Sequence, residues 1–178
     1  HYGEYTGSVK KFENFSNSIY VKKETGGGAL LSFSHHLDLA RLFFGKLKLK
    51  YSLLRNTNNF KINVEDTCKV ILSNKDNRDF LFNLNFLDTP QENFFILNFK
   101  KGSLKWSYNK NIVKIKNYNN FKNKIYRFKN FKRNQMFEDQ NIAFLRKVKK
   151  KTFTNKSLLE SYEIIKLINK IKLKKIHE

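Results

Sequence analysis

The sequence has very few of the residues that mark several common classes of protein. Its 178 residues include one cysteine, Cys68, and one proline, Pro90. A single cysteine excludes an internal disulfide, and with only four histidines it gives no zinc-binding spacing, so we expect no metal site. No apolar run approaches the roughly 20 residues that a membrane-spanning helix needs. These absences favour a protein of the reducing cytoplasm.

Glycine is scarce as well, and its positions exclude two catalytic motifs. The seven glycines stand at 3, 7, 26, 27, 28, 45 and 102. No G-x-G-x-x-G can be written over these positions, so the chain lacks the phosphate-binding turn of a dinucleotide-binding domain. It also lacks the G-x-S-x-G turn of an α/β-hydrolase. We therefore expect the chain alone to bind no nicotinamide dinucleotide.

Acidic residues are far outnumbered by basic ones. There are 15 Asp and Glu against 36 Lys and Arg, which gives a formal net charge of +21. Such an excess is typical of proteins that bind nucleic acid or an anionic surface. The cations are mostly lysine, whereas planar, bidentate recognition of phosphates and bases favours arginine. We interpret most of the charge as compositional and solvated at the surface, and expect neither a nucleic-acid partner nor a membrane partner.

Hydrophobic periodicity predicts an α+β fold. Hydrophobic residues make up 40% of the chain and aromatic residues 15%, which is ample for a packed core. From Lys46 the period is two, which is typical of strands joined by short turns. We expect strands over 47–51, 67–72, 80–87, 94–99, 104–106 and 112–116. Residues 1–178 thus read as a single two-layer domain, a largely antiparallel sheet of about six strands with helices mainly on one face.

Three helices are expected around this sheet. Residues 34–44 show helical spacing, with Ser34 as N-cap and Gly45 just past the end. A second helix opens near Arg133, after a Lys/Asn/aromatic stretch over 117–132 that we interpret as an outer loop. A third begins at a capping box, Ser157 and Glu160. Its apolar stripe is predicted to contain Leu158, Tyr162, Ile165 and Ile168, with Leu159, Ile164 and Ile171 beside it.

A glycine triplet, Gly26 to Gly28, stands shortly before His35, His36 and Asp38 at the start of the first helix. Glycine lets the backbone take positive φ and pass close to a ligand. Titratable groups at a helix N-terminus feel its positive field, which would keep an imidazole neutral and able to accept a proton. This pattern fits a substrate site, and it fits equally a tight turn before an ordinary helix.

The same stretch resembles the C-terminal domain of the Gfo/Idh/MocA family of NAD(P)-dependent oxidoreductases. The resemblance lies in the glycine triplet, in Ser34-His35-His36-Leu37-Asp38, and in Arg41 and Gly45. It continues in Val64-Glu65-Asp66-Thr67, Lys101-Gly102-Ser103-Leu104-Lys105-Trp106 and Arg133-Asn134-Gln135-Met136-Phe137. It covers the whole chain but only half of a typical family member, because the Rossmann half and its Glu-Lys-Pro segment are missing.

The resemblance implies a set of site residues. His35 would exchange a proton with a substrate hydroxyl. His36 is the alternative, because it lies four residues after position 32, where the family often has an Asp and this chain has Ser32. Gly26, Gly27, Gly28, Ser32 and Asp38 would shape the site, Asp38 by anchoring the helix. Candidate substrate contacts are Lys10, Tyr20 and Lys22.

The resemblance also implies partners and a cofactor. NAD or NADP would be bound by a Rossmann half, either joined to this chain or encoded separately. The chain begins at His1 without an initiator Met or a signal peptide, so we expect a fragment, a processed product or an incomplete reading frame. The open face of the sheet would mediate a homo-oligomer.

Three functions follow in order of preference. The first is the substrate-binding half of an NAD(P)-dependent oxidoreductase that acts on a hydroxyl of a sugar or sugar derivative and is inactive alone. The second is a non-catalytic binding or scaffold protein that keeps the fold. The third is a basic nucleic-acid binder.

Overall fold

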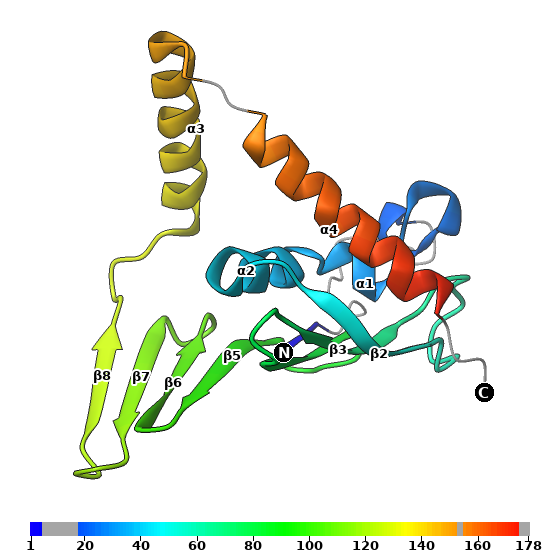
Figure 1. The fold of residues 1–178 in the computed structure, drawn as a ribbon. Helices are drawn as coiled ribbons and strands as arrows, with labels where there is room; N and C mark the ends of the chain where they lie inside the picture. The colour runs from blue at the N-terminus through cyan, green and yellow to red at the C-terminus, as the bar shows by residue number, and fades with distance from the viewer. Residues whose placement is uncertain (5–17, 153–154, 175–178) are drawn as a thin grey trace. The chain divides into compact units, whose positions relative to one another are not determined.

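The computed structural model describes residues 1–4, 18–152 and 155–174, without the side chains of Lys156 and Ser157. The chain divides into two compact units (Figure 1), which we describe separately. The first unit contains residues 1–92 and 160–178, and the second contains residues 93–159.

The first unit is a sheet with helices on one face. The strands are β1 (Tyr2–Gly3), β2 (Lys48–Arg55), β3 (Thr67–Ser73) and β4 (Asp79–Asn85), in the order β2-β3-β4-β1. The pairs β2–β3 and β3–β4 are antiparallel, and β1 runs parallel to β4. Figure 1 shows α1 (Ala29–Ser32), α2 (His35–Phe44) and α4 (Lys156–Leu173) covering one face of this sheet. Two short 3-10 turns, η3 (Ile19–Val21) and η4 (Lys23–Thr25), precede α1.

The core of the first unit lies between these helices and the sheet. Its fully buried side chains come from α1 and α2, from alternate positions on the strands, and from α4: Leu30, Leu37, Val70, Leu72, Leu84, Ile168 and Ile171. Alternation on the strands places these residues on a single face of the sheet. This burial is what fixes the start of α2, where the candidate histidines stand.

The second unit is a meander of antiparallel strands followed by a helix. The strands are β5 (Glu92–Phe99), β6 (Gly102–Ser107), β7 (Ile112–Asn117) and β8 (Asn123–Arg127), paired in sequence order. The helix is α3 (Arg133–Lys150), and none of its residues is buried.

The α+β, largely antiparallel fold is confirmed, with eight strands in the described residues against about six expected. The prediction of an outer loop over 117–132 is wrong, because β8 pairs with β7 there. The hairpin is held by asparagines: the Asn119 N–H donates to Asn117 Oδ1, and the Lys122 N–H donates to Asn120 Oδ1. The low complexity of the 117–132 sequence hid the asparagine-stabilised turn between β7 and β8.

The predicted face of the last helix is right for Ile168, Ile164 and Ile171 and wrong for the other residues named. The buried residues of α4 are Ile164, Leu167, Ile168 and Ile171, whereas Leu158, Leu159, Tyr162 and Ile165 are exposed. The predicted and observed stripes are neighbouring faces of one helix, and the sequence pattern was too apolar to separate them. The helix begins at Lys156, so Ser157 lies inside it rather than at the N-cap, and its side chain falls outside the described part.

Two further features bear on function. Cys68 is completely buried, and burial, aided by the charge of Glu65, raises the pKa of its thiol to about 12. It is therefore an inert core residue rather than a nucleophile. None of the helices, over the residues that the structure describes, is long and apolar enough to cross a membrane.

Candidate functional site

The two candidate histidines open α2, and α1 leads almost directly into it. Ser34 stands at the predicted N-cap position, but it has helical φ and ψ and makes no side-chain cap. The first N–H groups of α2 are already used: His36 donates to the Phe33 carbonyl, and Leu37 and Asp38 donate to the Ser34 carbonyl. Because these groups are satisfied within the chain, this terminus offers little to an anion.

His35 and His36 differ in exposure. The His35 side chain is exposed, with its ring centroid 4.4 Å from that of His36, 5.8 Å from Tyr2 and 6.5 Å from Phe33. His36 is only 9% exposed, with its ring 5.1 Å from Tyr2, and its Nε2 atom has no hydrogen-bond partner. Only His35 can therefore reach a substrate without local rearrangement.

Both imidazoles are held neutral. Partial desolvation among these rings lowers the pKa of His35. Burial, and then repulsion from His35 and His1, lowers the pKa of His36 to about 4. The lowered pKa values agree in direction with the sequence-based expectation. The cause is desolvation and, for His36, repulsion from the neighbouring imidazoles, rather than the field of a helix terminus. At neutral pH each ring keeps one nitrogen free to accept a proton.

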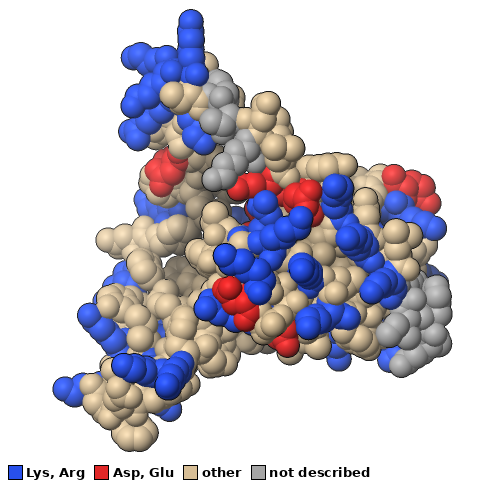
Figure 2. All heavy atoms as spheres, viewed as in Figure 1, with Lys and Arg blue, Asp and Glu red and all other residues tan. Residues whose placement is uncertain are grey.

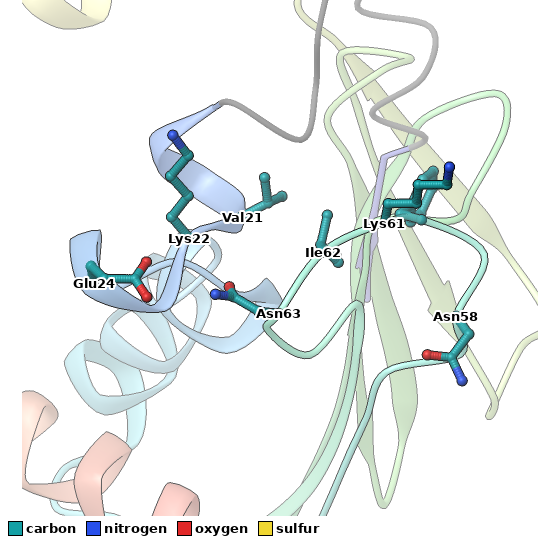
Figure 3. A pocket seen from close by; sticks show the side chains of 8 residues that line it. Val21, Lys22, Glu24, Asn58, Lys61, Ile62 and Asn63 are labelled. Atoms are coloured by element: carbon teal, nitrogen blue, oxygen red, sulfur yellow. The ribbon is translucent and has the colours of Figure 1, made fainter.

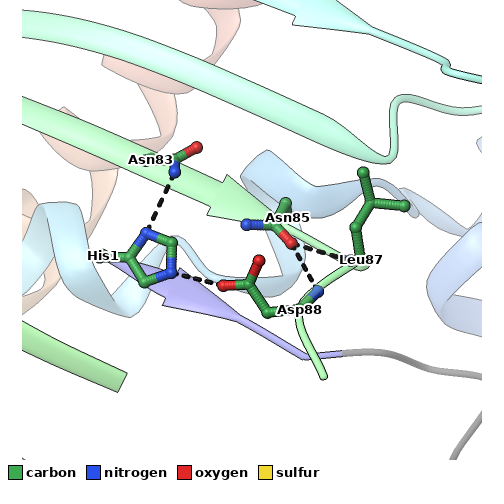
Figure 4. A network of polar contacts seen from close by, with 5 residues as sticks. All are labelled: His1, Asn83, Asn85, Leu87 and Asp88. Atoms are coloured by element: carbon green, nitrogen blue, oxygen red, sulfur yellow. Dashed lines mark hydrogen bonds and ion pairs between the residues drawn. The ribbon is translucent and has the colours of Figure 1, made fainter. Parts of the chain in front are cut away.

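A polar network lies beside the histidines at the end of β4 (Figure 4). His1 Nε2 lies 2.5 Å from Asp88 Oδ2, and the Asn83 amide lies 3.1 Å from His1 Nδ1. If the amide donates to Nδ1, the ring proton sits on Nε2 and faces the carboxylate. Asn85 Oδ1 accepts from the N–H groups of Leu87 and Asp88 and so holds this turn.

Sequence reasoning missed this network and the neighbouring Tyr2. The Tyr2 hydroxyl donates to Glu4 at 2.9 Å and accepts from Gln91 Nε2 at 2.7 Å. More than 80 residues separate the partners His1 and Asp88 in the sequence. They meet because β1 runs parallel to β4, with Tyr2 opposite Leu84. No local signal could have indicated this pairing.

The glycine triplet folds back on the segment that precedes it. The Gly28 N–H donates to the Tyr20 carbonyl and the Gly27 N–H to the Lys22 carbonyl, each at 2.8 Å. A Cβ at Gly27 would collide with the Tyr20 carbonyl, and Gly28 has φ of 114°. The triplet is thus required to bring Tyr20 and Lys22 against the start of α1.

A surface hollow of about 690 Å³ lies beside this segment (Figure 3). Lys22, Val21 and Glu24 line it on one side, and residues 58 and 60–63 line it on the other. Neither Tyr20 nor either histidine is among its lining residues. Figure 3 shows the amino groups of Lys22 and Lys61 pointing apart, so they do not converge on one anion. The structure therefore does not bring Lys22 and the histidines into one cleft.

The remaining predicted site residues lie in ordinary structural positions. Ser32 is the last residue of α1, and its N–H donates to the Gly28 carbonyl. Asp38 is exposed in the first turn of α2, where a carboxylate is favourable to the helix. Tyr20 is exposed. Lys10 lies outside the described residues.

The described residues bear on two further groups, a metal ion and a nicotinamide dinucleotide. Over residues 1–4, 18–152 and 155–174, no three His, Cys, Asp or Glu side chains are grouped to hold a metal ion. The glycine triplet does not fit a dinucleotide phosphate, because the Tyr20 backbone fills the space at Gly27 and the Glu65 carboxylate fills it at Gly28. A carboxylate at that position would repel a phosphate.

The family model of the GFO/IDH/MocA C-terminal domain matches residues 4–105. This is more than half of the chain, and the chain belongs to this family. No curated protein matches the sequence.

Solved structures share the fold at low identity. KijD10, a 3-ketoreductase from Actinomadura kijaniata solved with NADP and TDP-benzene, aligns with a TM-score of 0.74 and 16% identity over 90% of this chain and 50% of its own. A levoglucosan dehydrogenase in complex with NADH and levoglucosan aligns with a TM-score of 0.60 and 15% identity, over 71% and 37% of the two chains. An NAD binding oxidoreductase from Klebsiella pneumoniae aligns with a TM-score of 0.59 and 12% identity, over 70% and 37%. The chain thus spans half or less of the length of these structures.

Proposed function

We propose that this chain is the substrate-binding half of an NAD(P)-dependent oxidoreductase that acts on a hydroxyl of a sugar or sugar derivative. The observation that carries the proposal is His35, an exposed, neutral imidazole beside the aromatic rings of Tyr2 and Phe33. Family membership and neighbours that include a 3-ketoreductase and a levoglucosan dehydrogenase support the substrate class.

In this proposal His35 accepts the proton of a substrate hydroxyl and returns it in the reverse direction. A histidine suits this exchange, because its neutral form is a base of nearly the right strength at physiological pH. His36 packs against His35, stays neutral and prevents water from reaching the inner side of the ring. Tyr2, which is partly exposed, offers an apolar ring face to a pyranose, and the buried Phe33 supports that ring from below. Lys22, Tyr20 and Lys10 remain candidate contacts for more distant parts of the substrate.

A nucleotide-binding half has to supply the nicotinamide, which accepts the hydride in this class of enzyme. The described residues of this chain offer no fitting phosphate site, so we propose that the chain alone is inactive. The alternative of a non-catalytic scaffold draws on one observation: in the part of the chain that the structure describes, no carboxylate forms a hydrogen bond with His35 or His36. An imidazole without a carboxylate partner is a weaker base, because no carboxylate orients the ring or stabilises its protonated form.

The sheet of the second unit supports the proposed homo-oligomer. Strand register places Phe95, Trp106 and Val113 in one row and Leu97, Leu104 and Ile115 in the next, all on one face. The opposite face carries Lys105 and Lys114 directly across from each other. The apolar face is the one that a second copy of this chain would cover.

The test of the catalytic proposal replaces His35 and His36 separately in a protein that joins this chain to a nucleotide-binding half. We expect His35→Ala to lower kcat by about a hundredfold or more, because general-base catalysis contributes about 10² to 10⁴. The matched His36→Ala variant keeps most of its turnover. Full turnover in both variants would rule out a histidine base, and loss in His36→Ala alone would move the role to His36.

A further inference from the structure

The positive charge of this protein is concentrated in its second unit. Residues 93–159 contain 18 of the 36 Lys and Arg residues but only 2 of the 15 acidic residues, Glu138 and Asp139. Sixteen of the 21 net charges therefore belong to this unit. A general bias toward lysine in the composition would give both units a similar net charge per residue, so this asymmetry requires its own explanation.

Part of that charge gathers where two turns meet at one end of the β5–β8 sheet. We call Lys100, Lys101, Lys116, Tyr118, Phe121 and Lys122 the lysine–aromatic turns. The Tyr118 N–H donates to the Lys101 carbonyl at 3.0 Å, and the Asn117 N–H donates to the Lys122 carbonyl at 3.0 Å. Gly102 lies against the Lys116 carbonyl, where a Cβ would not fit. The backbone thus builds this cluster and holds its residues together.

The four lysines have no acidic neighbour. All are exposed, and none forms an ion pair among the described residues. In Figure 2 the region where Figure 1 draws the β7–β8 turn, at the lower left, shows lysine and arginine atoms and no acidic ones. Like charges fixed this close repel one another, and a bound polyanion relieves that repulsion.

The aromatic residues of the cluster are held outward at a conformational cost. Phe121 is 77% exposed and has φ of 53°, in the left-handed region that bulky residues avoid. Tyr118 is also exposed. A loop that served only solubility would need no exposed aromatic ring between its lysines, and no strained backbone to hold one there.

We propose that the lysine–aromatic turns bind single-stranded nucleic acid, with phosphates on the lysines and unpaired bases stacked on Tyr118 and Phe121. Exposed aromatic rings within a basic surface are how proteins hold single strands with little sequence preference. An anionic membrane fits less well, because Asn117, Asn119 and Asn120 interleave the rings, and amide side chains are costly to bury in lipid. This inference is independent of the proposed oxidoreductase function, since none of its residues belongs to the histidine site.

The test measures binding of the full 178-residue chain to fluorescein-labelled dT20 and rU20 by anisotropy, over a range of salt concentrations. Phe121→Gly removes the ring and relieves the left-handed strain, so lost binding cannot be attributed to unfolding. We expect it to weaken binding by roughly five- to 150-fold, the range found for one stacked base.

A matched pair of double variants separates this site from bulk charge. Lys101→Gln with Lys122→Gln removes two charges from the turns, and Lys48→Gln with Lys50→Gln removes two exposed charges from β2. We expect the first pair to weaken binding at least about tenfold and to reduce the salt slope by about 1.4, since each single-strand phosphate contact contributes about 0.7. The second pair should change the affinity less than twofold.

Three outcomes would overturn the proposal. They are equal weakening by the two double variants, no binding of either oligonucleotide at 100 mM salt, and tighter binding to vesicles of phosphatidylserine and phosphatidylcholine than to dT20. None of these outcomes bears on the histidine test, which uses turnover as its readout.

Discussion

At the scale of single residues, the most consequential feature is the pair formed by the buried His36 and its exposed neighbour His35. The Nε2 atom of His36 is buried without a partner, and positive charge on the neighbouring His35 or His1 ring would disfavour its charging. A residue of this kind makes stability depend on pH. Its ring also contributes to the burial that lowers the pKa of His35.

The pH dependence has a definite sign. The pKa of His36 is about 4 in the folded chain and about 6.5 when unfolded. Between these values the unfolded state binds a proton that the folded state does not, so stability is complete above pH 6.5 and is lost as the pH falls toward 4. A shift of this size corresponds to about 3 kcal/mol in the free energy of unfolding.

Urea denaturation at pH 7 and pH 4 checks this expectation in the native chain and in His36→Leu. Carboxylates titrate in both proteins, so the difference between the two isolates His36. We expect the native chain to lose about 3 kcal/mol more than the variant. Parallel losses in the two proteins would mean that His36 is protonated in the folded state at no cost.

At the scale of helices and strands, the sequence predicted the features that depend on residues close together in the chain. The bounds of α2 followed from Ser34 and Gly45, and the Gly45 N–H does donate to the Arg41 carbonyl. The strands followed from alternation. What sequence could not provide was the network of His1 and Asp88, because it depends on a parallel β1–β4 pairing across more than 80 residues. Likewise, the separation of Lys22 from the histidines depends on how the β2–β3 loop packs.

Helix α4 shows the same limit and gives a direct test. Its isoleucines occur on several faces, so periodicity alone placed the buried Ile168 and the exposed Ile165 in one stripe. Ile168 is 1% exposed and Ile165 is 47% exposed, three positions apart on one helix. We expect Ile168→Ala to lower the free energy of unfolding by about 2–4 kcal/mol, because it leaves a cavity. The matched Ile165→Ala should cost less than about 1 kcal/mol.

Chemical denaturation of both variants settles which stripe faces the core. Equal losses would mean that the face containing Ile165 is covered, and the core assignment of α4 would then have to be revised. A larger loss in Ile165→Ala would restore the stripe that the sequence predicted.

At the scale of the whole molecule, the two units divide the proposed tasks. The first unit carries His35, His36 and the smaller share of the net charge, and the second carries most of the net charge and an apolar sheet face. Net charge can be read from composition, but its concentration on 93–159 becomes meaningful only once the fold delimits that unit. The register gives the two faces of this sheet different character: one carries the rows of Phe95, Trp106 and Val113 and of Leu97, Leu104 and Ile115, and the other mixes Lys105 and Lys114 with aliphatic residues such as Ile96 and Ile125.

This sorting allows a matched test of the homo-oligomer. Ile115 and Ile125 are 38% and 43% exposed on neighbouring strands, but on opposite faces: Ile115 pairs with Leu104, and Ile125 pairs with Lys114. If a second copy covers the apolar face, Ile115→Glu buries a carboxylate at the interface, where even a pairing with Lys124 across the strand does not repay the desolvation cost, and converts the assembly to monomers. Ile125→Glu places the same charge opposite a lysine and leaves the assembly intact. Size-exclusion chromatography with light scattering distinguishes these outcomes, and an identical mass for both variants and the native chain would show that this apolar face does not mediate self-association.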